Sequence, residues 1–144
     1  MKVTIVGTGY VGLVTGTTFA EIGHEVLCID NDVAKIDMLN NRIMPIYEDG
    51  LEEMVVRNMD AGRLKFSESI EEGTAFAEVI FIAVGTPPGY RGEANMSYVE
   101  KVGRAVAENM SDYRLLVEKS TVIVNTSEQL KRTMNNYLKE DIPF

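Results

Sequence analysis

Apolar residues along this chain form short continuous runs, separated by longer stretches in which they recur at helical spacing. The clearest run covers residues 79–84, and similar runs cover residues 3–6, 26–29 and 115–117. Continuous apolar runs without polar alternation are typical of strands that are buried on both faces of a parallel sheet. The regular exchange of such runs with helical stretches predicts an α/β fold.

The pattern predicts five strands, near residues 2–7, 25–30, 64–66, 79–84 and 114–118. Right-handed crossovers and Rossmann wiring would place them in a doubly wound parallel sheet with the spatial order 3-2-1-4-5. We therefore expect one Rossmann-type domain over residues 1–144. A sixth strand of this wiring would begin near Phe144, so we expect it to be absent and the chain to be a fragment.

Several residues predict where the helices begin and end. Gly23 reads as the stop of the first helix, and Asp32 reads as the cap of the second. Ser67 or Ser69 would begin a short helix that runs to about residue 77. The spacing Thr126–Gln129 has the pattern of a capping box and predicts that Thr126 caps the last helix.

A glycine-rich turn, Gly7-Thr8-Gly9-Tyr10-Val11-Gly12, joins the first predicted strand to the first predicted helix. Gly7 would permit the tight turn, and Gly9 would let the backbone approach a pyrophosphate. Gly12 would let the helix pack closely on the strand, while the helix N-terminus presents free N–H groups to the phosphates. This arrangement predicts a dinucleotide site; the alternative is a βαβ unit that binds nothing.

An acidic residue follows the second predicted strand, at the position where a dinucleotide site has one. Asp30 ends the second strand 18 positions after Gly12, near the spacing of the acid that binds the adenosine ribose. A carboxylate there would repel a 2′-phosphate, which favours NAD over NADP. Lys35, in the next helix, is predicted either near the ribose or pyrophosphate or as a solvated helix lysine.

Composition and charge restrict the function further. The 144 residues carry a net charge of −8, which argues against nucleic acid as a partner. No apolar run could span a bilayer and no leader precedes the first strand, so we expect a cytoplasmic location. The single cysteine, Cys28, excludes an internal disulfide and a Cys-based zinc site, and we predict no metal. His24, the only histidine, is expected in a surface turn rather than as a catalytic base.

Four motifs together resemble the N-terminal domain of the UDP-glucose/GDP-mannose dehydrogenase family, and within it the UDP-glucose 6-dehydrogenase branch. They are residues 7–13 (GTGYVGL), 47–51 (YEDGL), 84–87 (VGTP) and 118–122 (EKSTV). The resemblance implies an NAD-dependent oxidation of the C6 alcohol of a nucleotide sugar to a carboxylate in two steps. The sequence does not say whether the sugar is UDP-glucose, GDP-mannose or UDP-N-acetylmannosamine.

The resemblance also implies roles for individual residues. Thr121 resembles a threonine that orients a water or the substrate hydroxyl, a supporting role because a hydroxyl is no base at neutral pH. The remaining implied contacts are all with NAD, along the turn, at the adenosine end and at the nicotinamide side: Gly7, Gly9, Tyr10, Val11, Gly12, Asp30, Lys35, Gly85, Thr86 and Thr121.

The family's nucleophilic cysteine, and the lysine, asparagine and aspartate around it, belong to later domains. We therefore predict that these 144 residues bind NAD without turnover, and that the full-length protein is a homodimer. Alternatives are a stand-alone NAD-responsive module and a dehydrogenase of 3-hydroxy acids. Departures from the family pattern are Asp49, residues 95–96, Ile123 and Asn125, where Pro, Asp-Leu, Pro and Gly are common.

Overall fold

The structure is a computed structural model that describes residues 1–88, 94–122, 124–139 and 142–144. Within these residues five strands form one parallel sheet, in the order β3-β2-β1-β4-β5. The predicted strand order and fold class are thereby confirmed. The strands are β1 (Lys2–Val6), β2 (Glu25–Ile29), β3 (Leu64–Ser67), β4 (Val79–Ile82) and β5 (Leu115–Glu118).

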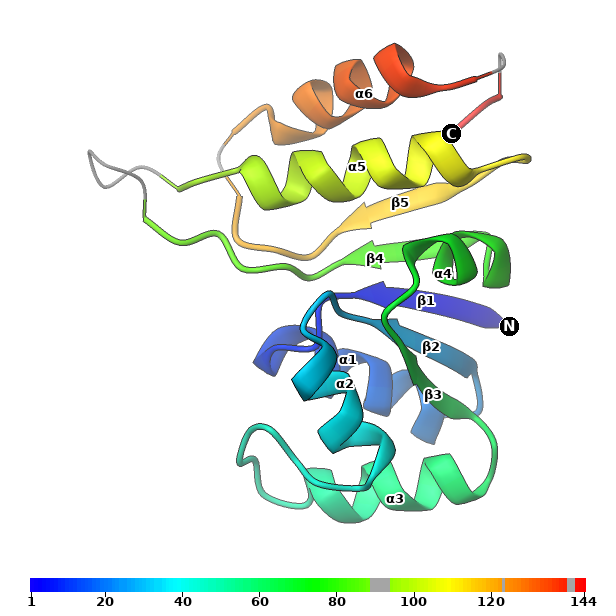
Figure 1. Cartoon of the computed structure of the whole chain (residues 1–144), viewed down its shortest axis with the longest axis vertical. Coiled ribbons are helices and arrows are strands. Elements are labelled where there is room, and N and C mark those ends of the chain that lie inside the picture. Colours follow the sequence, from blue (N-terminus) through cyan, green and yellow to red (C-terminus); the bar gives the residue numbers. More distant parts are fainter. Residues whose placement is uncertain (89–93, 123, 140–141) are drawn as a thin grey trace.

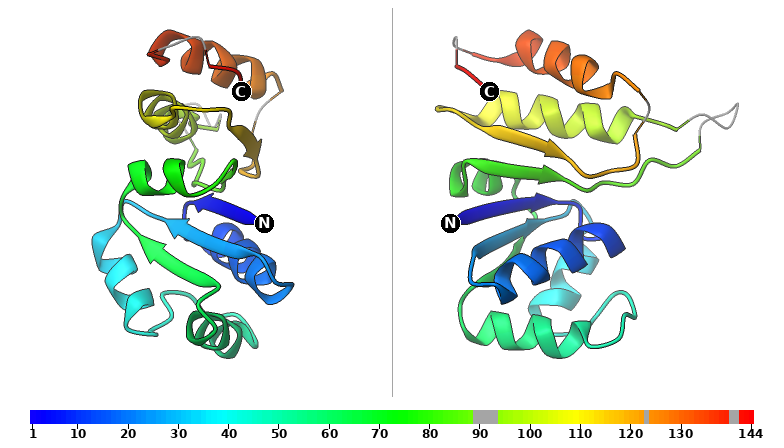
Figure 2. Two further views of the ribbon diagram at one scale, coloured as in Figure 1. Left: turned by 90° about the vertical axis from the view of Figure 1, so that its right-hand side faces the viewer. Right: turned by 180° about the vertical axis from the view of Figure 1, so that it is seen from behind.

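Helices cover the sheet on two sides (Figures 1 and 2). Helix α1 (Tyr10–Glu21) packs on β1 and β2 and contacts α3 (Leu51–Asp60), while α2 (Val33–Asn40) lies against β3. On the opposite face lie α4 (Ile70–Phe76), α5 (Ser97–Asn109) and α6 (Thr126–Tyr137). Helix α5 packs against both α4 and α6. None of the helices in the described ranges is long and apolar enough to cross a membrane.

The core has two parts because successive strand residues point to opposite faces. Ile5 belongs to the cluster under α1 and α3, and Val6 belongs to the cluster under α5 and α6. Gly16 lets α1 lie close to the sheet, since a Cβ there would stand 2.6 Å from Cys28 Sγ. Cys28 is fully buried, and burial raises the pKa of its thiol to about 12.

The fourth strand is shorter and less enclosed than its sequence predicts. Strand β4 ends at Ile82, two residues early, and its residues alternate between half-buried and buried. Phe81 is half-buried beside Phe19 of α1, with ring centroids 5.2 Å apart. On the α5 side, by contrast, Ile80 and Ile82 are completely covered. The prediction of burial on both faces was therefore wrong for this strand, because α1 covers it only in part.

Most predicted helix ends are confirmed. Asp32 Oδ1 accepts from Lys35 N–H at 3.1 Å, Ser69 Oγ accepts from Glu72 N–H at 3.1 Å, and Gly23 has φ +99°. The predicted cap of the last helix is wrong. Helix α6 begins with Thr126 as its first helical residue, and the N-cap is Asn125 with φ +70°.

Candidate cofactor-binding site

The candidate site lies along the edge where the parallel strands end. The arrowheads of the strands point to one side of the molecule, and the turn that leads into α1 lies on that side (Figure 1). Open α/β sheets bind their ligands at this edge, where the chain order reverses between neighbouring strands. Here that reversal falls between β1 and β4, next to the glycine-rich turn.

The three glycines of the turn meet three different surroundings. Gly7 has φ +103°, and a Cβ there would stand 2.6 Å from the carbonyl oxygen of Ala83. A Cβ on Gly12 would collide with the carbonyl of Gly7 itself. Around Gly9 a Cβ would meet nothing within 4 Å. Two glycines therefore permit close packing, while the third keeps the space beside the turn open.

The N-terminus of α1 faces this open space without a cap of its own. Its N-cap is Gly9, which offers no side chain to the first turn, and the first turn contains no acidic residue. The first N–H groups of an α-helix have no partner inside the helix and favour an anion. Tyr10 and Val11, the first two helical residues, are 56% and 50% exposed. This end of α1 can therefore receive a phosphate group.

Asp30 follows β2 and lies directly beside the turn. Its Oδ2 accepts from Thr8 N–H at 2.8 Å and from the Thr8 hydroxyl at 2.7 Å. The Lys35 ammonium donates to the same oxygen at 3.0 Å, and Asp32 N–H donates to Oδ1 at 3.0 Å. The structure thus brings the predicted acid, the predicted lysine and the glycine-rich turn together.

These contacts determine the charge state of Asp30. Burial raises the pKa of the carboxyl, but hydrogen bonds from Thr8, Asp32 and Lys35 outweigh this effect and hold the pKa below its ordinary value of 3.8. Asp30 is therefore ionised at neutral pH. Because only 9% of the residue is exposed, its negative charge acts at a confined position beside the turn.

At the other end of the edge, two hydroxyl groups join the loops that follow β4 and β5. The Thr86 hydroxyl donates to the carbonyl of Thr121 at 2.8 Å. The Ser120 hydroxyl donates to the carbonyl of Val84 at 2.8 Å. Gly85 lies between these links, and a Cβ there would meet nothing within 4 Å. The predicted residues Gly85, Thr86 and Thr121 thus lie in neighbouring loops.

Three further residues lie at the site although the sequence did not predict a role for them. Thr8 is completely buried and connects the turn to Asp30, while Ser120 links the two loops. Glu118 ends β5, where burial raises the pKa of its carboxyl; its Oε1 has no partner within the described ranges. All three belong to motifs already singled out in the sequence, residues 7–13 and 118–122, in which other residues were predicted to bind the cofactor. A hydroxyl or acid beside a strand end is the signal that could have found them.

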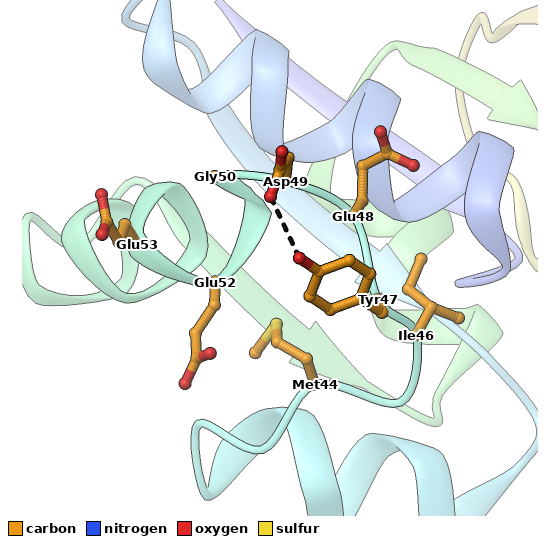
Figure 3. A pocket seen from close by; sticks show the side chains of 8 residues that line it. All are labelled: Met44, Ile46, Tyr47, Glu48, Asp49, Gly50, Glu52 and Glu53. Carbon is orange, nitrogen blue, oxygen red and sulfur yellow. Dashed lines mark hydrogen bonds between the residues drawn. The ribbon is translucent and has the colours of Figure 1, made fainter.

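A separate hollow of about 150 Å³ lies beside the turn that leads into α3 (Figure 3). Four carboxylates line it, together with Met44, Ile46 and Tyr47: Glu48, Asp49, Glu52 and Glu53. The negative charges of a pyrophosphate would be repelled there. The N-terminus of α1 is thus the better place for a dinucleotide.

The departures from the family pattern have local explanations. Asp49 accepts a hydrogen bond from the Tyr47 hydroxyl at 3.1 Å, as Figure 3 shows. Asn125 adopts a left-handed conformation, which asparagine tolerates better than most residues other than glycine. The chain can therefore keep a glycine-like turn there without glycine. Ile123 lies outside the described residues.

Comparison with known proteins identifies the family. Residues 1–143 match the profile of the UDP-glucose/GDP-mannose dehydrogenase family, NAD binding domain. The chain belongs to this family. The UDP-glucose 6-dehydrogenase YwqF of Bacillus subtilis is 44% identical over 142 residues, which cover 99% of this chain and 32% of that protein.

Solved structures agree with the family assignment. A UDP-glucose dehydrogenase from Pyrobaculum islandicum superimposes with a TM-score of 0.94 at 37% identity, covering 99% of this chain and 34% of that one. A GDP-mannose dehydrogenase from Pseudomonas aeruginosa gives 0.90 at 30% identity, covering 97% and 33%. The chain therefore spans about a third of the length of these relatives.

NAD is the cofactor of this domain family, and the residues present fit it. The bare N-terminus of α1 suits a pyrophosphate, and the ionised Asp30 suits a ribose diol. The family assignment also decides against the 3-hydroxy-acid dehydrogenase alternative.

Proposed function

We propose that the chain is the cofactor-binding domain of a nucleotide-sugar 6-dehydrogenase of the UDP-glucose type. The observation that supports this most is the uncapped N-terminus of α1 beside the ionised Asp30, in a chain 44% identical to a UDP-glucose 6-dehydrogenase. In the whole protein NAD⁺ would accept hydride twice, as a C6 alcohol becomes a carboxylate.

Within that function the domain holds and orients the cofactor. The glycine-rich turn and α1 would bind the pyrophosphate, and Asp30 with Lys35 would bind the adenosine end. Gly85, Thr86 and Thr121 would line the nicotinamide side. Thr121 is exposed and its carbonyl is fixed by Thr86, so its hydroxyl is available to orient a water or the substrate hydroxyl.

The domain alone should bind NAD without completing the reaction. Oxidation of an aldehyde by NAD⁺ requires a nucleophile that first converts it into a species with a transferable hydride. The only cysteine, Cys28, is completely buried in β2 and has a pKa of about 12. Its thiol is therefore neither accessible nor ionised, and the proposed dehydrogenase would take its nucleophile from another part of a longer protein.

Thermal unfolding with NAD tests the binding. A ligand that binds only the folded state adds about 2.7 kcal/mol at a concentration a hundred times its Kd, so the Tm should rise by several degrees. No change in Tm at millimolar NAD would contradict the proposal. A second assay follows absorbance at 340 nm with UDP-glucose and NAD⁺; we expect no NADH, and its formation would refute the predicted inactivity.

A stand-alone NAD-responsive module is the second candidate, and the inert Cys28 favours it equally. The reading frame beyond codon 144 separates the two functions. A continuation with an accessible cysteine and a nearby lysine supports the enzyme, whereas a stop codon supports the module.

A further inference from the structure

The turn that leads into α3 contains a reactive pair of neighbouring residues. Asp49 and Gly50 form the only Asp-Gly pair in the 144-residue sequence, which contains no Asn-Gly pair. The carboxyl carbon of an aspartate lies within reach of the next backbone nitrogen, and attack by that nitrogen closes a five-membered succinimide ring. Glycine as the next residue favours this attack, because no side chain shields its nitrogen and its backbone rotates freely.

Residues 48–51 form a type II turn. The Leu51 N–H donates to the carbonyl of Glu48 at 3.1 Å, and Gly50 has φ +74° and ψ −4°. Asp49 is not among the residues with a positive φ, which excludes a type I′ turn. Proline is common at the second position of a type II turn, and the family commonly has proline in place of Asp49. This chain therefore carries a carboxyl group where the family pattern has an unreactive ring.

The peptide unit between Asp49 and Gly50 is free to rotate. Within the described ranges, neither the Asp49 carbonyl nor the Gly50 N–H takes part in a hydrogen bond. Rotation of this unit converts a type II turn into a type I turn while the outer bond from Leu51 to Glu48 is kept, and glycine tolerates both conformations. The Gly50 nitrogen can therefore turn towards the Asp49 carboxyl group without loss of a hydrogen bond.

The Asp49 carboxyl group is accessible and weakly held. Asp49 and Gly50 are exposed, and the Tyr47 hydroxyl donates to Asp49 Oδ1 at 3.1 Å (Figure 3). Tyr47 is itself 82% exposed, so this hydrogen bond competes with water and does not fix the carboxyl group. A donor on a carboxyl oxygen also assists the departure of that oxygen.

Other aspartates of the described ranges lack this combination. The N–H that follows Asp60 donates to the carbonyl of Arg57 at 3.1 Å, and Asp37 lies within helix α2. Asp112 is followed by Tyr113, whose side chain shields the nitrogen. Asp49 is thus the aspartate at which ring closure meets the least resistance.

We propose that Asp49 and Gly50 are a site of spontaneous isoaspartate formation. The Gly50 nitrogen attacks Asp49 Cγ; an N–C bond forms, a carboxyl C–O bond breaks, and the oxygen leaves as water with the amide and carboxyl protons. Water then opens the succinimide ring. Addition at Cγ restores aspartate, whereas addition at the backbone carbonyl carbon gives isoaspartate, whose main chain runs through Cβ and Cγ. The reaction needs no oxidant, reductant or enzyme.

The test incubates the 144-residue chain for several weeks near physiological pH and temperature. Trypsin then releases residues 43–57, in which Asp49 is the only aspartate. Chromatography with mass spectrometry separates the aspartyl and isoaspartyl forms, and an isoaspartyl methyltransferase with S-adenosylmethionine measures the total. We expect roughly tenfold more isoaspartate in this peptide than in residues 58–63, which contain Asp60.

Substitutions of Asp49 test the chemistry. Asp49→Glu keeps the charge but requires a less favourable six-membered ring, so methylation should fall to background. Asp49→Asn keeps the size and presents a neutral amide, which the nitrogen attacks more readily than a carboxylate, with loss of ammonia; isoaspartate should form roughly tenfold faster. Asp37→Glu, on the exposed side of α2, is the matched control and should leave methylation unchanged.

A synthetic peptide of residues 43–57 shows how fast the same sequence reacts without the fold. A rate in the folded chain within about tenfold of the peptide rate supports the inference. If the peptide reacts and the folded chain stays at the level of residues 58–63, the turn protects Asp49 and the inference is wrong. Equal methylation of the wild type and Asp49→Glu would overturn it as well.

Discussion

At one end of this edge of the sheet a buried carboxylate accepts hydrogen bonds from a turn, a helix start and a lysine, whereas at the other end two hydroxyl groups join a pair of loops. At the Asp30 end, a Cβ added to Gly7 or Gly12 would collide with backbone atoms. The Thr86 end surrounds Gly85, where a Cβ would meet nothing within 4 Å. The first end is fixed by close packing, and the second by single hydrogen bonds.

This difference suggests a division of labour for the proposed cofactor site. A closely packed end keeps one shape with or without a ligand and can supply most of the binding energy. An end joined by two hydroxyl links can adjust to the part of the cofactor that reacts. Substitutions at the closely packed positions of the Asp30 end should therefore reduce stability and binding together, and substitutions at the Thr86 end should act mainly on the orientation of the nicotinamide.

The largest effect is expected from Gly12→Ala. Its methyl group would collide with the carbonyl of Gly7, which belongs to the backbone and cannot move without the turn. We expect a loss of about 3 kcal/mol in the free energy of unfolding, because overpacking against backbone leaves little room for relaxation, and NAD binding should disappear. Urea unfolding measures the first effect and calorimetry the second.

Gly9→Ala is the matched control for that substitution. Its methyl group meets nothing within 4 Å, so the free energy of unfolding should change by less than about 0.5 kcal/mol. The affinity for NAD should nevertheless fall, since the methyl group occupies the space predicted for the pyrophosphate. Equal effects of the two substitutions on stability would contradict the packing difference between Gly9 and Gly12.

Asp30→Asn should have the next largest effect, about 2 kcal/mol, because an amide cannot accept all the donors that Thr8 and Lys35 direct at Oδ2. The loss should depend on pH. The pKa of Asp30 is lower in the folded chain than its ordinary value of 3.8, so the unfolded chain binds the proton more readily. The stabilisation is thus complete above about pH 4 and disappears as the pH falls through the folded pKa.

Urea unfolding of Asp30→Asn and the wild type between pH 2 and pH 7 checks this dependence. The two curves should converge at low pH. Asp37→Asn, an exposed carboxyl on α2, should follow the wild type throughout. Curves for Asp30→Asn and the wild type that run parallel down to the lowest pH would show that the ionised carboxylate does not stabilise the turn.

Ser120→Ala should reduce stability less than Asp30→Asn does, by about 1 kcal/mol, because it removes one half-buried hydrogen bond to the carbonyl of Val84. Its clearer effect should be on NADH, whose nicotinamide fluorescence rises when the ring is immobilised. We expect the enhancement to fall while the affinity for ADP-ribose is kept. Thr18→Ala removes a hydroxyl that donates to the carbonyl of Val14 within its own helix, and should leave the fluorescence unchanged. Loss of ADP-ribose binding in Ser120→Ala would contradict the division between the two ends.

The sequence predicted the Asp30 end better than the Thr86 end, for a physical reason. Gly7, Gly9, Gly12 and Asp30 occupy one βαβ unit, where spacing along the chain determines position in space. The links of Thr86 and Ser120 depend on the register of β4 with β5, which pairs residues 36 positions apart. No local pattern reports such a contact.

Two other features, the role of Thr8 and the start of α6, were also not predicted from the sequence. The hydroxyl of Thr8 is buried against Asp30, but its position in the turn is variable in the motif and predicted nothing. The spacing Thr126–Gln129 matched a capping box, yet the left-handed Asn125 starts α6 one residue earlier. Both were decided by backbone conformation and tertiary contact, which outweigh a short polar pattern.

The most direct test of the account is an NAD titration followed by the assigned amide resonances of this chain. We predict the largest shifts at the N–H groups of residues 8–12 and at Asp30, with smaller shifts at Thr86 and Thr121. Shifts confined to the hollow around Tyr47, or none at residues 8–12 at saturating NAD, would contradict the assignment of the cofactor site to the N-terminus of α1.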